Sequence, residues 1–472
     1  MTAATPSAPT VLSRSAYAVR EGRAIADRRV RIVHIGLGAF HRSHQAWYTS
    51  RSHDTEPWGI AAFTGRSPLM AEVLSAQDGL YTLVERSDAG DAVEVVDSIV
   101  EAHDGARLSR FVELIAAPAT AVVTLTVTEP GYRLIADGSV DLGDPEVAHD
   151  LVELVDLFAH EPLVPSDQSG PRTALGRLLL GLEARRRADA GPIAVVPCDN
   201  VPSNGDFVRH GLLDLAGRVE SAIHDWIARN VSFVSTSVDR ITPQTTDEDL
   251  ADVERLSGWR DRAPVVTEPF HDWVLCGDFP AGRPSWQDAR FVADVEPFER
   301  RKLWLLNGAH SLLAYAGTRR GHVSVSEAIA DPVCRAWVEE FWDEAARHLP
   351  DGLDVREYRV SLLARFANTR IEHRLEQIGG EAVAKLRARI VDVARAELAA
   401  GRDAHGCARV VAEWIAVLRG GTVLADVAAA SVSRALHDDD DRALIALIDE
   451  SLARDARFVA AVAAAHQRKG AS

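Results

Sequence analysis

A helix-like run at residues 301–310 places a lysine, an asparagine and a histidine in an otherwise apolar segment. At 3.6 residues per turn, Asn307 lies about 140° and His310 about 80° around the helix axis from Lys302, so all three share one face. The surrounding leucines and tryptophan are typical of a buried helix. Burial lowers the pKa of a lysine, and such a lysine can act as a general base. The alternative is that the lysine reaches solvent while the other two make ordinary core hydrogen bonds.

Residues 36–41, Gly-Leu-Gly-Ala-Phe-His, follow a predicted strand at 31–36 and precede a segment that suits a helix start. Glycines in this position allow a tight turn and a close approach of a dinucleotide phosphate to the backbone. His41 occupies the third glycine position of G-x-G-x-x-G, so the motif is weak by itself, and an ordinary strand-end turn is the alternative. The predicted cofactor-binding residues are Gly36, Gly38, Ala39, Phe40, Arg66 and Asp78.

The end of the second predicted strand, at 58–63, bears on the choice of cofactor. An NAD-binding domain usually has an acidic residue here, which accepts hydrogen bonds from the ribose, but residues 63–68 read Phe-Thr-Gly-Arg-Ser-Pro. Arg66 suits an adenosine 2′-phosphate, and the alternatives are that it covers the adenine or lies on the surface. The expected cofactor is NAD or NADP.

Strands alternate with helices over the first 290 residues, which indicates a doubly wound, largely parallel α/β sheet. The predicted strands lie at 31–36, 58–63, 121–127, 193–196 and 231–237, with helices at 174–186 and 204–215. Beyond residue 297 the predicted elements are all helices, at 297–319, 324–348, 357–377, 381–400, 404–418, 442–452 and 458–466. We therefore predict a Rossmann-type dinucleotide-binding domain over 1–290 and a mainly α-helical substrate and catalytic domain over 291–472.

The composition is that of an acidic globular protein with a formal net charge of −17. This charge argues against nucleic acid or an anionic membrane as the main partner, although an anionic small ligand remains compatible with it. The four cysteines include no C-x-x-C pair, which suits a reducing compartment, and no metal ion is expected because His41 and His44 lack suitably spaced partners. Residues 1–22 predict a frayed lead-in rather than a signal peptide, and no stretch is long enough to span a membrane. We expect a cytoplasmic protein.

Seven segments resemble, in order, those of the mannitol dehydrogenase family of long-chain polyol dehydrogenases, which also contains fructuronate and tagaturonate reductases. They are residues 36–46, 76–82, 126–132, 198–205, 238–243, 268–270 and the helix that carries Lys302, Asn307 and His310. The resemblance covers about residues 30–420.

This resemblance implies a substrate cleft between the two domains and metal-independent hydride transfer between NAD(P) and a secondary alcohol. It places NAD slightly ahead of NADP and allows a monomer. Lys302 would be the general base, and Asn200 and Asn307 would hydrogen-bond the developing alkoxide as an oxyanion hole. His310 would orient a neighbouring hydroxyl, and Glu129 would lie on a proton route to solvent. The alternative is that Asn200 is a turn former and Glu129 an ordinary loop carboxylate.

The same resemblance points to residues that bind the rest of the substrate, and these are Asp239, His373, Gln377, Lys385 and Arg389. The His-Arg…Gln and Lys-Leu-x-x-Arg pattern looks more like the uronate-reductase branch, whose substrate carries a carboxylate, whereas residues 379–384 depart from the loop expected before the lysine. We therefore place a polyol 2-dehydrogenase, converting mannitol and fructose, first and fructuronate reductase, which forms mannonate, second. A catalytically silent dinucleotide-binding sensor and a hydroxy-acid dehydrogenase are the alternatives from other classes.

Overall fold

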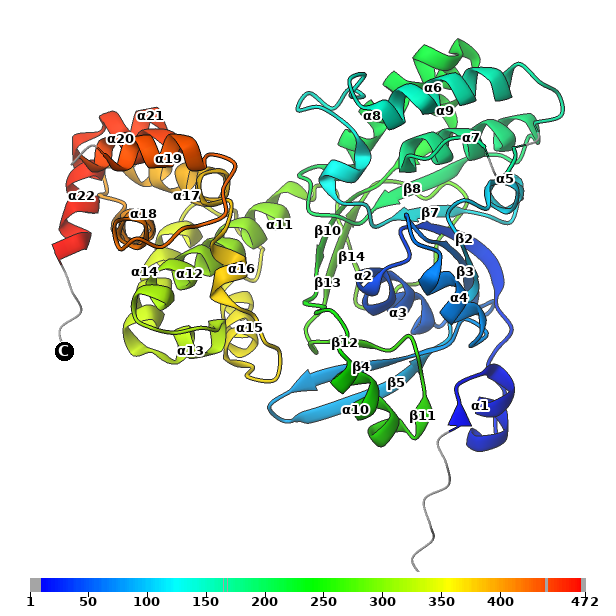
Figure 1. Cartoon of the computed structure of the whole chain (residues 1–472), viewed down its shortest axis with the longest axis horizontal. Helices are drawn as coiled ribbons and strands as arrows, with labels where there is room; N and C mark the ends of the chain where they lie inside the picture. Colours follow the sequence, from blue (N-terminus) through cyan, green and yellow to red (C-terminus); the bar gives the residue numbers. More distant parts are fainter. Residues whose placement is uncertain (1–9, 164, 168, 438–439, 468–472) are drawn as a thin grey trace, which may run out of the picture. The chain divides into compact units, whose positions relative to one another are not determined.

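The computed structural model describes residues 10–467 except 164, 168, 438 and 439, and the chain divides into two compact units, residues 1–295 and 296–472 (Figure 1). The first unit is α/β with a parallel sheet and the second is mainly helical, so the predicted fold class is confirmed. Residues 1–9 of the predicted lead-in lie outside the described residues.

A six-stranded sheet lies at the centre of the first unit, and its strands run in the order β6-β3-β2-β7-β8-β9 with every pairing parallel. The strands are β2 (Arg29–Ile35), β3 (Trp58–Phe63), β6 (Ile99–His103), β7 (Val122–Leu125), β8 (Ile193–Pro197) and β9 (Val231–Phe233). This is the strand order of a Rossmann domain, and it reverses direction between β2 and β7. A ligand crevice is therefore expected outside the carboxyl ends of these two strands.

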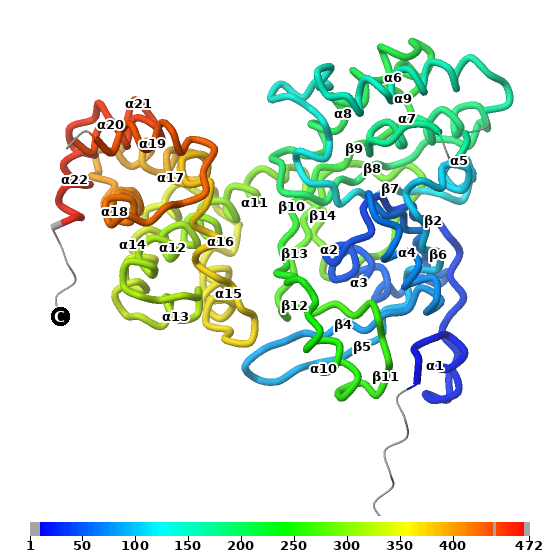
Figure 2. Tube along the Cα trace, in the orientation of Figure 1, coloured from blue at the N-terminus to red at the C-terminus, as the bar shows by residue number. Residues whose placement is uncertain are grey.

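Helices cover both faces of this sheet, because successive strand residues point to opposite sides and both sets are apolar. Ile32 belongs to the core that contains residues of α3 and α4, whereas Val33 belongs to the core that contains residues of α5 to α9. Figure 2 shows the path of the chain through these helices. The helices of this layer structure are α2 (Ala39–Ser43), α3 (Gln45–Ser50), α4 (Leu69–Ser75), α5 (Leu108–Ala116), α6 (Pro145–Phe158), α7 (Ala174–Arg187), α8 (Asn204–Val219) and α9 (Ser221–Asn230), with the 3-10 turn η1 (Glu129–Tyr132).

Three smaller sheets, with the orders β1-β11, β12-β4-β5 and β10-β13-β14, complete the first unit. Their strands are β1 (Thr10–Val11), β4 (Tyr81–Ser87), β5 (Gly90–Val96), β10 (Ser235–Asp239), β11 (Trp259–Arg260), β12 (Val265–Thr267), β13 (Asp272–Cys276) and β14 (Arg290–Phe291), and the remaining helices are α1 (Arg14–Glu21) and α10 (Asp247–Ser257). The sequence predicted a frayed lead-in up to residue 22, but residues 14–21 form the helix α1, so this part of the prediction is wrong. Ser13 caps this helix, and Arg14 fixes it by donating to the carbonyl oxygen of Asp97 at 3.0 Å.

The second unit consists of helices, and several predicted long helices are divided. Its elements are α11 (Glu296–Arg301), η2 (Lys302–Gly308), α12 (Ala309–Arg319), α13 (Val325–Ala330), α14 (Pro332–Ala346), α15 (Val355–Ala367), α16 (Leu375–Gly379), α17 (Ala382–Ala399), α18 (His405–Arg419), α19 (Ala429–Leu436), α20 (Asp441–Ile448), α21 (Glu450–Arg454) and α22 (Ala456–Gln467). The 324–348 prediction fails at Asp331, which is extended and caps α14 ahead of Pro332. Asp449 divides 442–452 in the same way, by accepting from the Leu452 amide.

No helix in the described part of the chain combines the length and apolar character that a membrane span requires.

Candidate active site

The loop that follows β2 has the backbone geometry of a phosphate-binding turn. Gly36 has a φ of +107°, and a Cβ there would lie 2.7 Å from the carbonyl oxygen of Thr126, so only glycine fits. Gly38 is extended, with a φ of −125°, and an added Cβ would meet nothing closer than 3.6 Å. The amides of Gly36 and Leu37 both donate to the carbonyl oxygen of Phe63 at 2.9 Å, which fixes the loop to the end of β3.

His41, which occupies the third glycine position, is buried beneath this loop. Its ring stacks on His34 with centroids 3.3 Å apart and an angle of 9° between the planes. Burial lowers the pKa of His34 to about 3 and that of His41 well below its usual value, so both rings are neutral near pH 7. The histidine therefore fills the space under the loop and does not face the crevice.

A cavity of about 650 Å³ opens at the predicted crevice. The loops after β2, β3, β6 and β7 line it, together with Asp167, residues 169–174 and Arg177, and Gly36 and Arg66 are both on its wall. Gly105 brings the loops after β3 and β6 together, because its Cβ would lie 2.1 Å from the carbonyl oxygen of Thr64. Its size, its position at the reversal of strand order and its glycine-lined wall fit the adenosine and phosphate parts of NAD(P).

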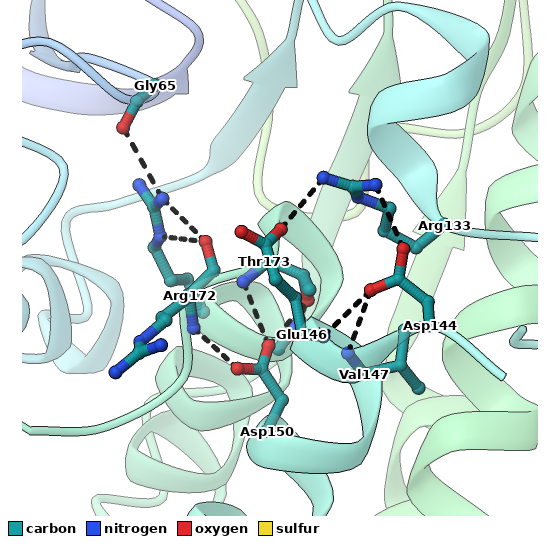
Figure 3. A network of polar contacts seen from close by, with 10 residues as sticks. Gly65, Arg133, Asp144, Glu146, Val147, Asp150, Arg172 and Thr173 are labelled. Carbon is teal, nitrogen blue, oxygen red and sulfur yellow. Dashed lines mark hydrogen bonds and ion pairs between the residues drawn. The ribbon is translucent and has the colours of Figure 1, made fainter. Parts of the chain in front are cut away.

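A polar network forms the wall of this cavity on the side of α6 and α7 (Figure 3). Asp150 accepts from the amides of Arg172 and Thr173 at 2.6 and 2.9 Å and from the Thr173 hydroxyl at 2.7 Å. Arg177 donates to the carbonyl oxygens of Thr64 and Gly65 at 3.3 and 3.4 Å, which connects this wall to the end of β3. Burial raises the pKa of Asp150 above its usual value.

The structure does not bring Asp78 to this cavity. Asp78 accepts from the backbone amide of Arg14 at 3.0 Å, and a Cβ on the adjacent Gly79 would touch the carbonyl of Ile99, the first residue of β6. It therefore lies at the amino end of the sheet, whereas the phosphate loop lies at the carboxyl end. The prediction of Asp78 as a cofactor residue is corrected accordingly, since α4 carries the chain back across the sheet before Asp78 is reached.

Two of the predicted catalytic residues follow adjacent parallel strands. Glu129 begins η1 after β7, Asn200 lies in the turn after β8, and both are exposed at the same edge of the sheet. Asp199 connects the two segments, because it accepts from the Tyr132 hydroxyl at 2.5 Å and from the Val201 amide at 2.9 Å. Burial raises the pKa of Asp199 above its usual value. This arrangement holds Asn200 in a fixed turn.

Asp239 is the last residue of β10 and is buried. The guanidinium of the adjacent Arg240 pairs with Glu85 and donates to the carbonyl oxygen of Ser43 at 2.6 Å. Thr236 of the same strand donates its amide to Asn204 at 2.8 Å, so β10 is tied to the start of α8, just beyond the Asn200 turn.

In the second unit, the predicted helix over 297–319 is interrupted by a π-helical segment, η2, that begins at Lys302. Hydrogen bonding in a π-helix runs from residue i to i+5, so residues five apart lie on successive turns, and such segments are frequent at functional sites. Lys302 and Asn307 are five apart and both are partly exposed, whereas residues 304–306 are buried. The 140° separation expected from an α-helix is therefore wrong, and the π-helix brings the two residues closer around the axis.

Neighbouring helices hold this π-helix in place. The indole of Trp342 donates to the carbonyl oxygen of Leu305 at 2.7 Å. Gly308 lies against the ring of Phe341, because a Cβ added at Gly308 would lie 2.5 Å from the nearest ring carbon. Arg389 donates to the carbonyl oxygen of Asn307 at 3.1 Å. The unusual backbone is thus stabilised by contacts from α14 and α17.

His310 lies one turn further along, 8% exposed, and its Nε2 atom has no hydrogen-bond partner among the described residues. Its ring packs edge-on against His373 with centroids 4.8 Å apart. Burial, His373, Arg365, Arg389 and Lys385 all lower the pKa of His310, in that order of influence, so the ring is neutral near pH 7. A neutral imidazole with an unsatisfied nitrogen is suited to a substrate hydroxyl.

We refer to Arg365, Lys385 and Arg389 as the cationic cluster. Lys385 donates to the carbonyl oxygen of Ile378 at 3.0 Å, and Arg389 donates to the Ser311 hydroxyl at 2.9 Å. Within the part of the chain that the structure describes, neither Lys385 nor Arg389 forms an ion pair. Burial lowers the pKa of both, that of Arg389 to about 10. Gln377, in contrast, is exposed on α16.

Sequence reasoning missed several side chains of these sites. Arg172 and Arg177 line the cavity, Tyr132 donates to Asp199 beside the Asn200 turn, and Arg365 lies close enough to His310 to lower its pKa. Tyr132 stood inside one of the resembling segments and was the most accessible to prediction. Arg172, Arg177 and Arg365 lie in no recognisable sequence motif, so the sequence alone could not identify them as site residues.

Comparison with known proteins identifies both units. Residues 30–288 match the family model described as the mannitol dehydrogenase Rossmann domain, and residues 294–468 match the mannitol dehydrogenase C-terminal domain. D-mannonate oxidoreductase of Escherichia coli (strain K12) is 34% identical over 467 residues, covering 93% of each chain.

Two solved structures are also similar over nearly the whole chain. The ternary complex of Pseudomonas fluorescens mannitol 2-dehydrogenase with NAD and D-mannitol is 31% identical, with a TM-score of 0.77 and coverage of 98% of this chain and 94% of that one. A substrate-free D-sorbitol dehydrogenase is 26% identical, with a TM-score of 0.85 and coverage of 93% of each chain.

Proposed function

Because the chain belongs to the mannitol dehydrogenase family of NAD(P)-dependent oxidoreductases acting on CH–OH groups, we propose that it transfers hydride reversibly at a secondary alcohol of an open-chain sugar acid. The pair that the sequence placed second, fructuronate and mannonate, becomes the first candidate. Mannitol and fructose become the second.

The proposed roles divide between the two units. Residues 1–295 would hold the dinucleotide, with Gly36, Gly38, Ala39 and Phe40 at its phosphates. Residues 296–472 would supply the base and most substrate contacts. When bound, the nicotinamide would accept the hydride or return it.

Lys302 is proposed to take the hydroxyl proton during oxidation and to return it during reduction. The amides of Asn200 and Asn307 are proposed to donate to the oxygen as negative charge develops on it. His310, neutral and with a free Nε2 among the described residues, would bind an adjacent hydroxyl. Glu129 is exposed and would pass protons to solvent.

The preference for a sugar acid is carried by the cationic cluster. Lys385 and Arg389 lie near His310 without an ion pair among the described residues, and both are half-buried. Removing a cation from water costs free energy unless another group compensates its charge. A substrate carboxylate would supply that compensation through charge-assisted hydrogen bonds. The similarity to D-mannonate oxidoreductase over 93% of both chains supports the same assignment.

The neutral polyol is kept as the second candidate for a specific reason. The hydrogen bonds of Lys385 to the carbonyl of Ile378 and of Arg389 to the Asn307 carbonyl and the Ser311 hydroxyl give both cations partial compensation within the protein. The similar mannitol 2-dehydrogenase was solved with D-mannitol. Asp239 and His373 would then bind hydroxyls.

The test is oxidation of reduced nicotinamide, followed by absorbance, with fructuronate and with fructose as acceptors. Fructuronate should be reduced with the higher kcat/KM, and Lys385→Gln should lower that value about 10- to 100-fold while changing the value for fructose much less. Arg356→Gln, which alters an exposed arginine of the same unit, is the control. Equal loss with both acceptors, or a preference for fructose, would refute the carboxylate assignment, and turnover of neither would support the silent sensor.

A further inference from the structure

The end of β3 has no carboxylate to bind an adenosine ribose. β3 lies beside β2 in the sheet, and in a Rossmann domain the strand at this place carries the acidic residue that accepts from the ribose hydroxyls. Here the strand ends at Phe63 and continues as Thr64, Gly65 and Arg66. The carbonyl oxygens of Thr64 and Gly65 are already occupied by the guanidinium of Arg177.

The carboxylates that do line the cavity are engaged by other groups. Asp104 accepts from the amide of Ala106 at 3.1 Å. Glu146 pairs with Arg133 at 2.8 Å (Figure 3). The third, Asp167, accepts from the amide and the hydroxyl of Ser109 at 2.9 and 3.2 Å. The acidic groups of the wall are therefore used to hold loops and turns.

Four arginines line the same cavity, and the guanidinium groups of two of them form no ion pair or hydrogen bond among the described residues. Arg133 is ion-paired and Arg177 is held by carbonyl oxygens. Arg66 and Arg172 line the cavity as exposed side chains, and across the described residues neither guanidinium has an ion pair or a hydrogen bond. In a chain with a net charge of −17, this local excess of cations marks a place for an anion.

We propose that this cavity binds the 2′-phosphate of NADP, so that the protein prefers NADP(H) over NAD(H). Arg66, at the position where an NAD-specific domain has its acid, makes the principal contact with the phosphate. Arg172, from the segment between α6 and α7, adds a second positive charge to the cavity. The ring of an adenine would lie between the glycine loop and these side chains, where Gly65 lines the cavity and an added Cβ would meet no atom within 4 Å.

Binding of nucleotide fragments tests this proposal without any substrate. Isothermal titration calorimetry of the full chain should show adenosine 2′,5′-bisphosphate binding at least about 10-fold more tightly than AMP, because a phosphate held by arginine makes charge-assisted hydrogen bonds. Arg66→Ala should remove most of this difference and Arg172→Ala part of it, with AMP affinity unchanged. Arg229→Ala, an exposed arginine of α9 away from the cavity, should leave the ratio as it is. The difference should also shrink as salt is raised.

Equal affinity for the two fragments, or a ratio that Arg66→Ala leaves unchanged, would overturn the proposal. An increased preference for AMP in Arg66→Asp would support it further, since that substitution restores the acid expected for NAD. Far-UV circular dichroism of each variant shows whether the chain is folded. A failed substrate assay with a 2′-phosphate preference intact would refute only the proposed substrate, because these measurements require no turnover.

Discussion

The two glycines of the phosphate loop should respond differently to alanine. At Gly36 the backbone has a φ of +107°, which costs a non-glycine residue about 1–3 kcal/mol. The new Cβ would also lie 2.7 Å from the carbonyl oxygen of Thr126, and relieving such an overlap costs about 1–3 kcal/mol more. The free energy of unfolding of the first unit should therefore fall by about 2–6 kcal/mol.

Gly38 is the matched control within the same loop. Its φ of −125° is accessible to alanine, and the nearest atom to an added Cβ is the Gly36 carbonyl oxygen at 3.6 Å. Gly38→Ala should change the free energy of unfolding by less than about 1 kcal/mol, yet it should weaken NAD(P) binding, because the Cβ would hinder the approach of the phosphates.

Urea denaturation followed by tryptophan fluorescence gives the first quantity, and calorimetric titration with NAD(P) gives the second. The reasoning predicts that Gly36→Ala loses stability and that Gly38→Ala loses mainly cofactor affinity. If the two variants were equally stable, or if Gly38→Ala bound NAD(P) like the parent chain, the assignment of this loop would be refuted.

Three further results are expected. Lys302→Ala should lower kcat by at least about 100-fold while NAD(P) affinity, measured by titration, stays unchanged; loss of affinity would place Lys302 in the nucleotide site. Acidification from pH 7 to 5 should lower the free energy of unfolding by about 2 kcal/mol for each of His34 and His44, whose pKa burial lowers to about 3, because the unfolded chain binds their protons first; urea titrations of His44→Gln should show a shallower pH slope. Trp342→Phe should cost about 1–3 kcal/mol and reduce kcat, because the Leu305 carbonyl of the π-helix loses its donor; unchanged values in denaturation and kinetics would contradict this.

Local patterns in the sequence predicted the class of each unit and five of the six strands of the central sheet, but they missed the edge strand β6. The run at 58–63 has the bounds of β3, because a buried parallel strand is a continuous apolar segment that ends at turn residues. Most helices of the second unit were predicted, but their divisions at Asp331 and Asp449 were not, since a capping aspartate inside an apolar pattern resembles an exposed helix position.

By itself the sequence determined the alternation of strands and helices in the first unit, the glycine loop after β2 and the family to which the chain belongs. The tertiary structure alone decided that η2 is a π-helix, because its hydrogen bonding is supported by Trp342 and Arg389 from distant helices. It also placed Asp78 at the wrong end of the sheet for a cofactor and Arg172 at the right one. Such placements depend on contacts between residues far apart in the chain, which the local sequence pattern around each residue does not predict.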